Sequence, residues 1–311
     1  MPRSRPPGPT PEVPQTAGPP ARPGTDLRRI AEALERAFPP PTWSAALLAA
    51  GAMRMRWTGD RLVAAAHAAP IDPGLFRGVE AQMAALGANL AALAAGAPAH
   101  DMLLWGARGM GKSALVKSLA HAHGLPLVEA GSAALESLGA LFALLAGAPR
   151  PTVVFVDDLA FEEGGRELRR LRSLLDGGVE ARPAHVRLAV TSNHRHLIAR
   201  SSTEPEGARH ARDLAEDQLA LVDRFGLVLG FHLPDQETYL DMCRAYLERD
   251  GLPLDEADAL AFALARGTRS GRTAWHYRVE RLARRAVAAA EPGMQEAAAA
   301  SERGGGPGRP G

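Results

Sequence analysis

Short apolar runs alternate with helical patterns along the middle of the chain. The apolar runs are short and rich in aliphatic, β-branched or aromatic residues, as buried strands are; they cover residues 102–105, 125–130, 152–156, 186–191 and 227–231. Apolar residues at helical spacing follow the first three runs, over residues 113–123, 135–145 and 167–175. Strands that alternate with helices predict an α/β fold, with a parallel sheet covered by helices on both faces.

The segment after Pro234 contains only helical patterns. They cover residues 235–250, 255–266 and 271–290. We therefore predict an α/β domain at residues 70–233, followed by a small all-helical domain at residues 234–290.

The two ends of the chain have different patterns. Apolar residues recur at helical spacing between residues 27 and 38, and residues 43–55 predict a second helix. Residues 25–69 are therefore expected to form a short helical N-terminal region. Residues 1–24 are dominated by Pro, Gly and Arg, and residues 291–311 drift from Ala into Gly and Pro. Such segments bury too little apolar surface to fold, so both are predicted to be disordered tails.

Composition favours a helix-rich core and gives little information about partners. Of the 311 residues 46% are hydrophobic, but much of this fraction is Ala, which favours helices. The 36 basic and 35 acidic residues leave a net charge of +1, which gives no overall argument for nucleic acid or an anionic membrane. A single cysteine, Cys243, excludes a disulfide within the chain. No stretch approaches the roughly 20 apolar residues of a membrane helix, and no signal peptide is recognisable, so we expect a soluble, cytoplasmic protein without a membrane partner.

A phosphate-binding loop follows the first predicted strand. The pattern G-x-x-x-x-G-K-[ST] is matched in full by Gly106-Ala107-Arg108-Gly109-Met110-Gly111-Lys112-Ser113. Glycines let backbone N–H groups approach phosphate oxygens, and the helix that begins here adds its positive dipole. We expect the segment from Gly106 to Ala114 to bind ATP, with Lys112 on the outer phosphates and the Ser113 hydroxyl on Mg²⁺. The alternative is a glycine turn that precedes a helix by chance.

Two carboxylates end the strand predicted at residues 152–156. Asp157 and Asp158 therefore fall at the carboxyl edge of the sheet, where ligands bind in open α/β folds. We expect Asp157 to hold the Mg²⁺ that accompanies the nucleotide. The alternative is that the two acids cap the following helix.

A series of short motifs resembles one class of P-loop protein. Residues 70–285 are similar to AAA+ ATPases, and several stretches resemble more closely a bacterial family of uncharacterised AAA+ proteins, domain-of-unknown-function family 815. These stretches are residues 103–109 (LLWGARG), 155–164 (FVDDLAFEEG), 175–177 (LDG), 181–183 (ARP), 191–193 (TSN) and 223–227 (DRFGL). Their order and spacing cover most of the chain that is expected to fold. The resemblance implies an ATPase whose helical domain at residues 234–290 is the AAA+ lid.

The resemblance also implies roles for residues outside the P-loop. Asp158 stands where AAA+ enzymes usually carry a glutamate that polarises the attacking water, and Asn193 stands at the sensor position that orients this water. Arg224 resembles the arginine finger, which reaches the γ-phosphate of a neighbouring subunit. Arg272 resembles the second sensor, which reports the nucleotide state to the lid. Simpler alternatives are a turn asparagine for Asn193 and a surface arginine paired with Asp223 for Arg224.

Two further expectations come from the same resemblance. Residues 78–79 match the segment that contacts adenine in such enzymes. Asp158 is shorter than the usual glutamate by one methylene group, and the positioning of a water is sensitive to such a change. Hydrolysis is therefore expected to be slow unless Glu162 or Glu163 contributes.

These residues predict an enzyme that hydrolyses ATP with Mg²⁺ and drives a conformational change in a homo-oligomer, either a ring or an open ring, with an unknown protein client. One alternative is a nucleotide-gated loader that hydrolyses ATP weakly and acts on DNA. Basic runs at residues 166–172 and 281–285 could touch DNA, but solvated helical faces are the simpler interpretation. Another alternative is a small-molecule P-loop kinase, against which the sensor and finger positions argue.

Overall fold

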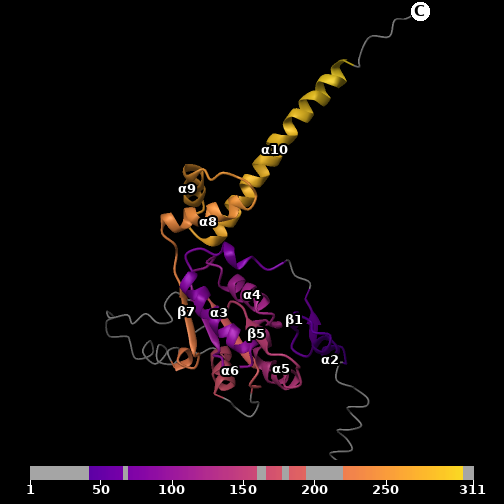
Figure 1. Cartoon of the computed structure of the whole chain (residues 1–311), viewed down its shortest axis with the longest axis vertical. Coiled ribbons are helices and arrows are strands. Elements are labelled where there is room, and N and C mark those ends of the chain that lie inside the picture. Colours follow the sequence, from indigo (N-terminus) through magenta and orange to yellow (C-terminus); the bar gives the residue numbers. More distant parts are fainter. Residues whose placement is uncertain (1–41, 66–68, 160–165, 177–181, 194–219, 304–311) are drawn as a thin grey trace, which may run out of the picture. The chain divides into compact units, whose positions relative to one another are not determined.

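The computed structural model describes residues 42–65, 69–159, 166–176, 182–193 and 220–303 (Figure 1). The chain divides into two compact units, residues 1–42 and 43–311. Of the first unit only Thr42 is described, so the helix predicted near residues 27–38 and the tail predicted at residues 1–24 lie outside the described residues. The fold is that of the second unit.

A mostly parallel sheet forms the centre of this unit. Within the described residues it has seven strands, in the order β2-β1-β4-β5-β6-β3-β7. The strands are β1 (Arg54–Trp57), β2 (Leu62–Ala64), β3 (Met102–Gly106), β4 (Leu127–Ala130), β5 (Thr152–Val156), β6 (Val186–Ser192) and β7 (Leu227–Phe231). Neighbouring strands pair in parallel, except for the antiparallel pair of β1 and β2.

Alternate residues of the strands face two separate hydrophobic cores. Leu104 of β3 joins one core, whereas its neighbour Leu103 joins the other. In the same way, Phe155 and Val154 of β5 belong to different cores. A sheet that is buried on both faces needs apolar side chains in both orientations, which explains the continuous apolar runs in the sequence.

Helices cover both faces of this sheet. One core contains side chains of α3 (Glu80–Ala94) and α4 (Lys112–Ala122), and the other contains side chains of α5 (Leu138–Leu145) and α6 (Arg166–Leu175). Short 3-10 turns precede α3 and α5: η1 (Pro73–Leu75) and η2 (Ser132–Ser137). The predicted α/β fold, with a parallel sheet between layers of helices, is therefore confirmed.

Helices also make up the described chain after β7. They are α8 (Gln236–Glu248), α9 (Glu256–Ala265) and α10 (Gly271–Arg303). Asp235 and Asp255 cap α8 and α9, since each carboxylate accepts a hydrogen bond from the backbone N–H three residues on, at 2.8 and 3.0 Å. Tyr239 of α8 and Tyr277 of α10 are fully buried in the core that also holds α4. The all-helical region predicted after the sheet is therefore present, and α8 and α10 share a hydrophobic core with α4.

The N-terminal prediction needs a correction. The helix predicted at residues 43–55 ends early, as α2 (Thr42–Ala49), and the chain then forms β1 and β2. The segment at residues 25–69 is therefore not wholly helical, because a β-hairpin from it extends the sheet. Buried and exposed side chains alternate along β1, but over four residues this strand period is too short to stand out in the sequence.

Two further elements differ from the prediction. Helix α10 continues to Arg303 instead of ending at Ala290, so the tail predicted at residues 291–311 begins too early. Helix α3 is absent from the predicted elements, because Gly87 and Asn89 interrupt its apolar pattern. Within the described residues, no helix combines the length and the apolar character needed to cross a membrane.

Candidate nucleotide-binding site

The loop between β3 and α4 has the backbone that phosphate binding requires. Gly106, Gly109 and Gly111 have positive φ angles of 120°, 78° and 83°. At Gly106 any side chain is excluded, because a Cβ atom would lie 2.1 Å from the carbonyl oxygen of Phe231 on β7. Gly111 caps α4 in the left-handed conformation, and the helix begins at Lys112. The first turn of α4 therefore opens toward the loop, where its free N–H groups can bind an anion.

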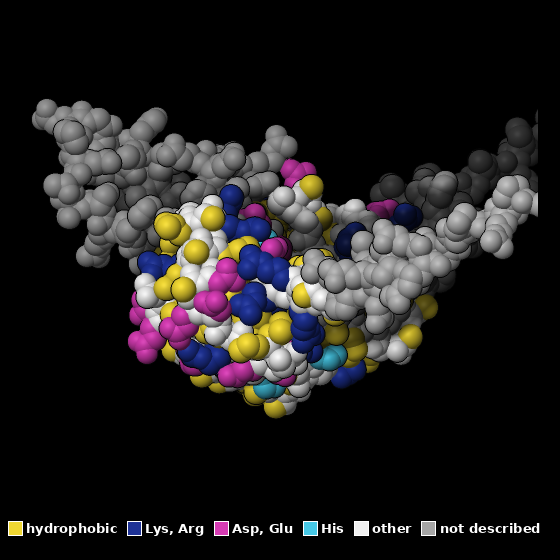
Figure 2. Space-filling model, turned by 90° about the horizontal axis from the view of Figure 1, so that it is seen from above, with side chains coloured by type: hydrophobic (Ala, Val, Ile, Leu, Met, Phe, Trp, Pro, Cys, Tyr) yellow, Lys and Arg dark blue, Asp and Glu magenta, His cyan; other side chains and the backbone are white. Residues whose placement is uncertain are grey.

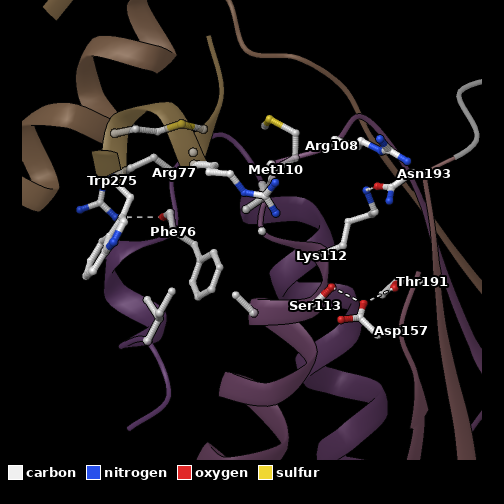
Figure 3. A pocket seen from close by; sticks show the side chains of 18 of the residues that line it. Phe76, Arg77, Arg108, Met110, Lys112, Ser113, Asp157, Thr191, Asn193 and Trp275 are labelled. Atoms are coloured by element: carbon white, nitrogen blue, oxygen red, sulfur yellow. Dashed lines mark hydrogen bonds between the residues drawn. The ribbon is translucent and has the colours of Figure 1, made fainter. Parts of the chain in front are cut away.

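A cavity of about 580 Å³ lies at this loop (Figure 3). Its lining includes most of the predicted site residues: Arg108, Gly109, Met110, Gly111, Lys112, Ser113, Ala114, Asp157, Asp158, Asn193 and Arg272. Gly106, Ala107 and Arg224 are predicted site residues that do not line it. The structure thus brings the P-loop, the two acids, Asn193 and the first turn of α10 together around one space.

Lys112 is buried at the polar end of the cavity. Its Nζ donates hydrogen bonds to the carbonyl oxygens of Gly106 and Ala107 at 2.8 and 2.9 Å, and to Oδ1 of Asn193 at 2.9 Å. These bonds use all three donors of the ammonium group. Burial lowers the pKa of Lys112 to about 8, although Asp158 and Asp157 nearby favour the charged form. A bound phosphate would supply the negative charge that holds this amine protonated.

Ser113 and Asp157 provide oxygen atoms next to this amine. The Ser113 hydroxyl donates to Oδ1 of Asp157 at 2.5 Å, and the Thr191 hydroxyl donates to the same oxygen at 2.6 Å (Figure 3). Within the described residues, no group of three or more His, Cys, Asp or Glu side chains could hold a metal by itself. One hydroxyl and one carboxylate fit Mg²⁺, which takes few protein ligands and completes its shell with phosphate oxygens and waters.

Asp158 and Asn193 meet beside the same two groups. The Asn193 side-chain amide donates to Oδ1 of Asp158, while its carbonyl oxygen accepts from Lys112. The backbone N–H of Asp158 donates to the Thr191 hydroxyl at 2.8 Å. Thr191 was not among the predicted site residues, although it belongs to the TSN motif at residues 191–193. The signal available was a hydroxyl near the end of a mostly apolar strand.

The opposite end of the cavity carries aromatic side chains, with Arg77 beside them (Figure 3). Figure 3 shows Phe76 and Trp275 there, on the far side of Met110 from Asn193. The cavity lining also includes Ile71 and Val79 from the segment before α3, and Met242 and Tyr246 from α8. Of the two residues expected to contact adenine, Val79 lines the cavity and Gly78 does not. The aromatic residues are absent from the prediction, because they are brought together by the packing of the lid.

A backbone hydrogen bond joins the P-loop to the lid. The N–H of Arg272, in the first turn of α10, donates to the carbonyl oxygen of Gly109 at 2.9 Å. The approach is close, since a Cβ atom at Gly109 would lie 2.9 Å from Oγ of Ser270. The Arg272 side chain lines the cavity at this point. The P-loop tip and the start of α10 are therefore in direct contact.

Arg224 lies away from the cavity, at the end of a short turn before β7. Its guanidinium donates to both carboxylate oxygens of Asp176, at 3.1 Å to Oδ2, and to the carbonyl oxygen of Ala220. The hydrogen bond from Arg224 lowers the pKa of Asp176. The partner is thus Asp176 rather than Asp223, the pairing weighed from the sequence. Glu162 and Glu163, the acids considered as helpers of Asp158, lie outside the described residues.

The basic run on α10 is paired within the lid. Arg281 and Arg284 lie 3.7 and 3.0 Å from the carboxylate of Asp258, and Arg285 donates to the carbonyl oxygen of Asp250 at 3.1 Å. Figure 2 shows Lys and Arg side chains interspersed with Asp and Glu side chains on the face seen from above. The described part of this face is therefore mixed in charge, as a solvated helical surface is.

The fold and the cavity together define the class of protein. A P-loop between a parallel strand and a helix, two acids at the end of a neighbouring strand and a helical lid form a nucleotide-binding domain of the AAA+ type, as the motifs predicted. Residues 50–285 match the family described as "Protein of unknown function (DUF815)", and the chain belongs to this family.

Several solved structures align with the chain over a large part of its length. One is Thermotoga maritima RuvB, the Holliday junction branch migration motor, with 19% sequence identity and a TM-score of 0.47. A proline-to-glycine mutant of the same RuvB aligns with 19% identity and a TM-score of 0.46. The two alignments each cover 67% of this chain, and 63% and 64% of the RuvB chains. No curated protein matches the chain in sequence.

Proposed function

We propose that the chain hydrolyses ATP with Mg²⁺ and thereby drives a conformational change in a homo-oligomer, which acts on a protein client. The observation that supports this proposal most strongly is the polar end of the cavity. There Lys112, the Ser113–Asp157 pair and the Asp158–Asn193 pair surround one space next to the N-terminus of α4. These are the groups that phosphoryl transfer to water requires: a phosphate cradle, metal ligands and a group that orients the nucleophile.

Binding would rearrange hydrogen bonds that are already present. Lys112 would release the carbonyl oxygens of Gly106 and Ala107 and turn to the outer phosphates, while P-loop N–H groups hold the inner ones. Ser113 and Asp157 would hold Mg²⁺, which neutralises charge on the phosphates. The base would occupy the aromatic end between Phe76 and Trp275.

Hydrolysis would depend on Asp158 and Asn193. Their side chains are hydrogen-bonded to each other and so can hold one water between them and the terminal phosphate. The hydrogen bond between Gly109 and Arg272 gives the lid a direct connection to the loop that moves with the phosphates. Loss of the terminal phosphate would therefore change the position of α10, and this motion is the output to the client.

Arg224 would complete the site of a neighbouring subunit. In the single chain it forms an ion pair at the surface with Asp176, whose side chain is about half exposed. Exposed ion pairs contribute little to stability, so Arg224 can exchange Asp176 for a phosphate at small cost. An arginine donated in this way stabilises charge in the transition state.

A second candidate function follows from the length of Asp158. A nucleotide-gated loader that hydrolyses ATP slowly would need only the binding half of the site, and a shorter acid is consistent with slow hydrolysis. Turnover that is low alone and stimulated by single- or double-stranded DNA would favour this candidate. Turnover that DNA leaves unchanged would favour the first.

The proposal is tested by ATP turnover over a series of protein concentrations. The rate per chain should rise with concentration, because each site needs Arg224 from a neighbour. Arg224→Ala should keep ATP binding and lose turnover by roughly 10³-fold, the lower range for an arginine finger. Arg244→Ala is the matched control, since Arg244 forms similar exposed ion pairs on the lid. Turnover independent of concentration and unaffected by Arg224→Ala would exclude catalysis between subunits.

A further inference from the structure

The backbone of Asp158 has an uncommon conformation. Its φ angle is +53°, and within the described ranges it is the one residue other than glycine with a positive φ. In this left-handed region the Cβ atom crowds the following carbonyl oxygen, and Asp and Asn tolerate it better than most residues, because their short polar side chains can hydrogen-bond locally. The residue type at this position therefore suits the backbone that it has to adopt.

Thr191 fixes this backbone from the neighbouring strand. It forms three hydrogen bonds with consecutive residues after β5: its hydroxyl donates to Asp157, its hydroxyl oxygen accepts from the N–H of Asp158, and its carbonyl oxygen accepts from the N–H of Leu159 at 2.8 Å. A hydroxyl has one proton, so donation to Asp157 leaves only lone pairs for Asp158. Thr191 is 1% exposed, so its hydroxyl is shielded from bulk solvent.

The same hydrogen bonds set the direction of the Asp158 carboxylate. The turn that they hold presents Oδ1 of Asp158 to the Asn193 amide. A glutamate at this backbone position would carry its carboxylate one methylene group further, past the point at which Oδ1 of Asp158 meets the amide. The left-handed turn thus compensates for the short side chain.

We propose that Thr191 is a positioning residue for ATP hydrolysis, which holds Asp158 in the left-handed conformation, and that the site is built for aspartate rather than glutamate. This inference rests on the proposed function, because it concerns the water that attacks ATP. It also revises the expectation that the shorter acid must slow hydrolysis.

The test compares Thr191→Val with Thr191→Ser in the full-length chain. Valine keeps the shape of threonine and removes the hydroxyl, whereas serine keeps the hydroxyl. At saturating ATP and Mg²⁺, Thr191→Val should lower kcat on the order of 10- to 100-fold, the effect of displacing a reacting group by about 1 Å. Its ATP dissociation constant should stay within about 3-fold of the parent's, and Thr191→Ser should restore most of kcat.

Several results would overturn the inference. One is a Thr191→Val variant that keeps the parental kcat, and another is a loss of kcat that Thr191→Ser does not restore. A third is a loss of kcat that excess Mg²⁺ reverses, because Thr191 would then act only through the metal ligand Asp157. Asp158→Glu gives an independent test that does not depend on the folding of Thr191→Val. It should lower turnover, and an increase would refute the claim that the site is built for aspartate. A parent chain that binds ATP without hydrolysing it would instead refute the proposed function, and this inference with it.

Discussion

Replacing Gly109 with alanine should weaken ATP binding by disturbing the contact between the P-loop and the lid. Gly109 has a φ angle of +78°, and its carbonyl oxygen accepts the hydrogen bond from the N–H of Arg272. A Cβ atom here would lie 2.9 Å from Oγ and 3.2 Å from Cβ of Ser270, and 3.2 Å from Cβ of Arg272. Ser270 is 3% exposed and has little room to move.

The expected size of the effect has two parts. A left-handed alanine costs about 1–2 kcal/mol relative to glycine. Crowding against a packed neighbour adds about 1 kcal/mol or more, and it acts on the loop that binds phosphate. If about 1.4 kcal/mol of this strain is relieved when the loop moves out of its binding geometry, ATP affinity falls about tenfold.

Gly96→Ala is the matched control. Gly96 also has a positive φ angle, 73°, but a Cβ atom there would meet nothing within 4 Å. Both variants should lower the melting temperature, by about 2–4 °C for each kcal/mol lost. Only Gly109→Ala should also weaken the binding of Mg-ATP in isothermal titration calorimetry. If the two variants lost equal stability and both kept parental affinity, the contact between the P-loop and the lid would have no part in binding.

Two other predictions concern the ends of the cavity. Burial lowers the pKa of Lys112 from 10.5 to about 8, so between these values the unfolded chain binds one proton more than the folded chain, and the contribution of Lys112 to stability rises with pH. Lys112→Met should flatten this rise of stability with pH in thermal melts. When the parent binds Mg-ATP at pH 9, it should take up close to one proton, which calorimetry in buffers of different ionisation heat measures. No proton uptake would contradict the environment assigned to Lys112. Trp275→Ala should weaken ATP binding roughly tenfold, as loss of a stacked base contact does. The affinity for inorganic tripolyphosphate, which has no base, should stay unchanged. Equal losses of affinity for both ligands would exclude a base site at the aromatic end.

The phosphate-binding part of the site could be predicted because its chemistry is local. The P-loop glycines act through their own backbone, and Lys112 and Ser113 stand at the start of the helix that the loop begins. Asp157 could be placed because a buried strand that ends in an acid delivers it to the carboxyl edge of a parallel sheet. These residues needed no information about distant parts of the chain.

The remaining residues depend on register and packing between distant segments. Thr191 reaches Asp157 only because β5 and β6 pair in a register that opposes Val156 to Val190. The aromatic end joins Phe76 and Trp275, which are separated by most of the folded chain. A single sequence does not fix such register or packing, and for this reason Thr191 and Trp275 were not among the predicted site residues.

Arg224 illustrates the same limit for ion pairs. From the sequence, the obvious partner was the adjacent Asp223, whereas the structure pairs Arg224 with Asp176, 48 residues away. An ion pair between neighbours in sequence can be guessed from spacing, but one between a helix end and a distant turn follows only from the fold.

Titration of the folded, full-length chain with Mg-ATP in a calorimeter tests the central claim most directly. The parent should release or absorb measurable heat. Mg-ATP at about 100 times its dissociation constant should add about 2.7 kcal/mol to the free energy of unfolding and so raise the melting temperature. Lys112→Ala should lose both signals, whereas Lys117→Ala, on the same helix but paired with Glu129, should keep them. A folded parent that shows no heat of binding and no rise in melting temperature would contradict the account.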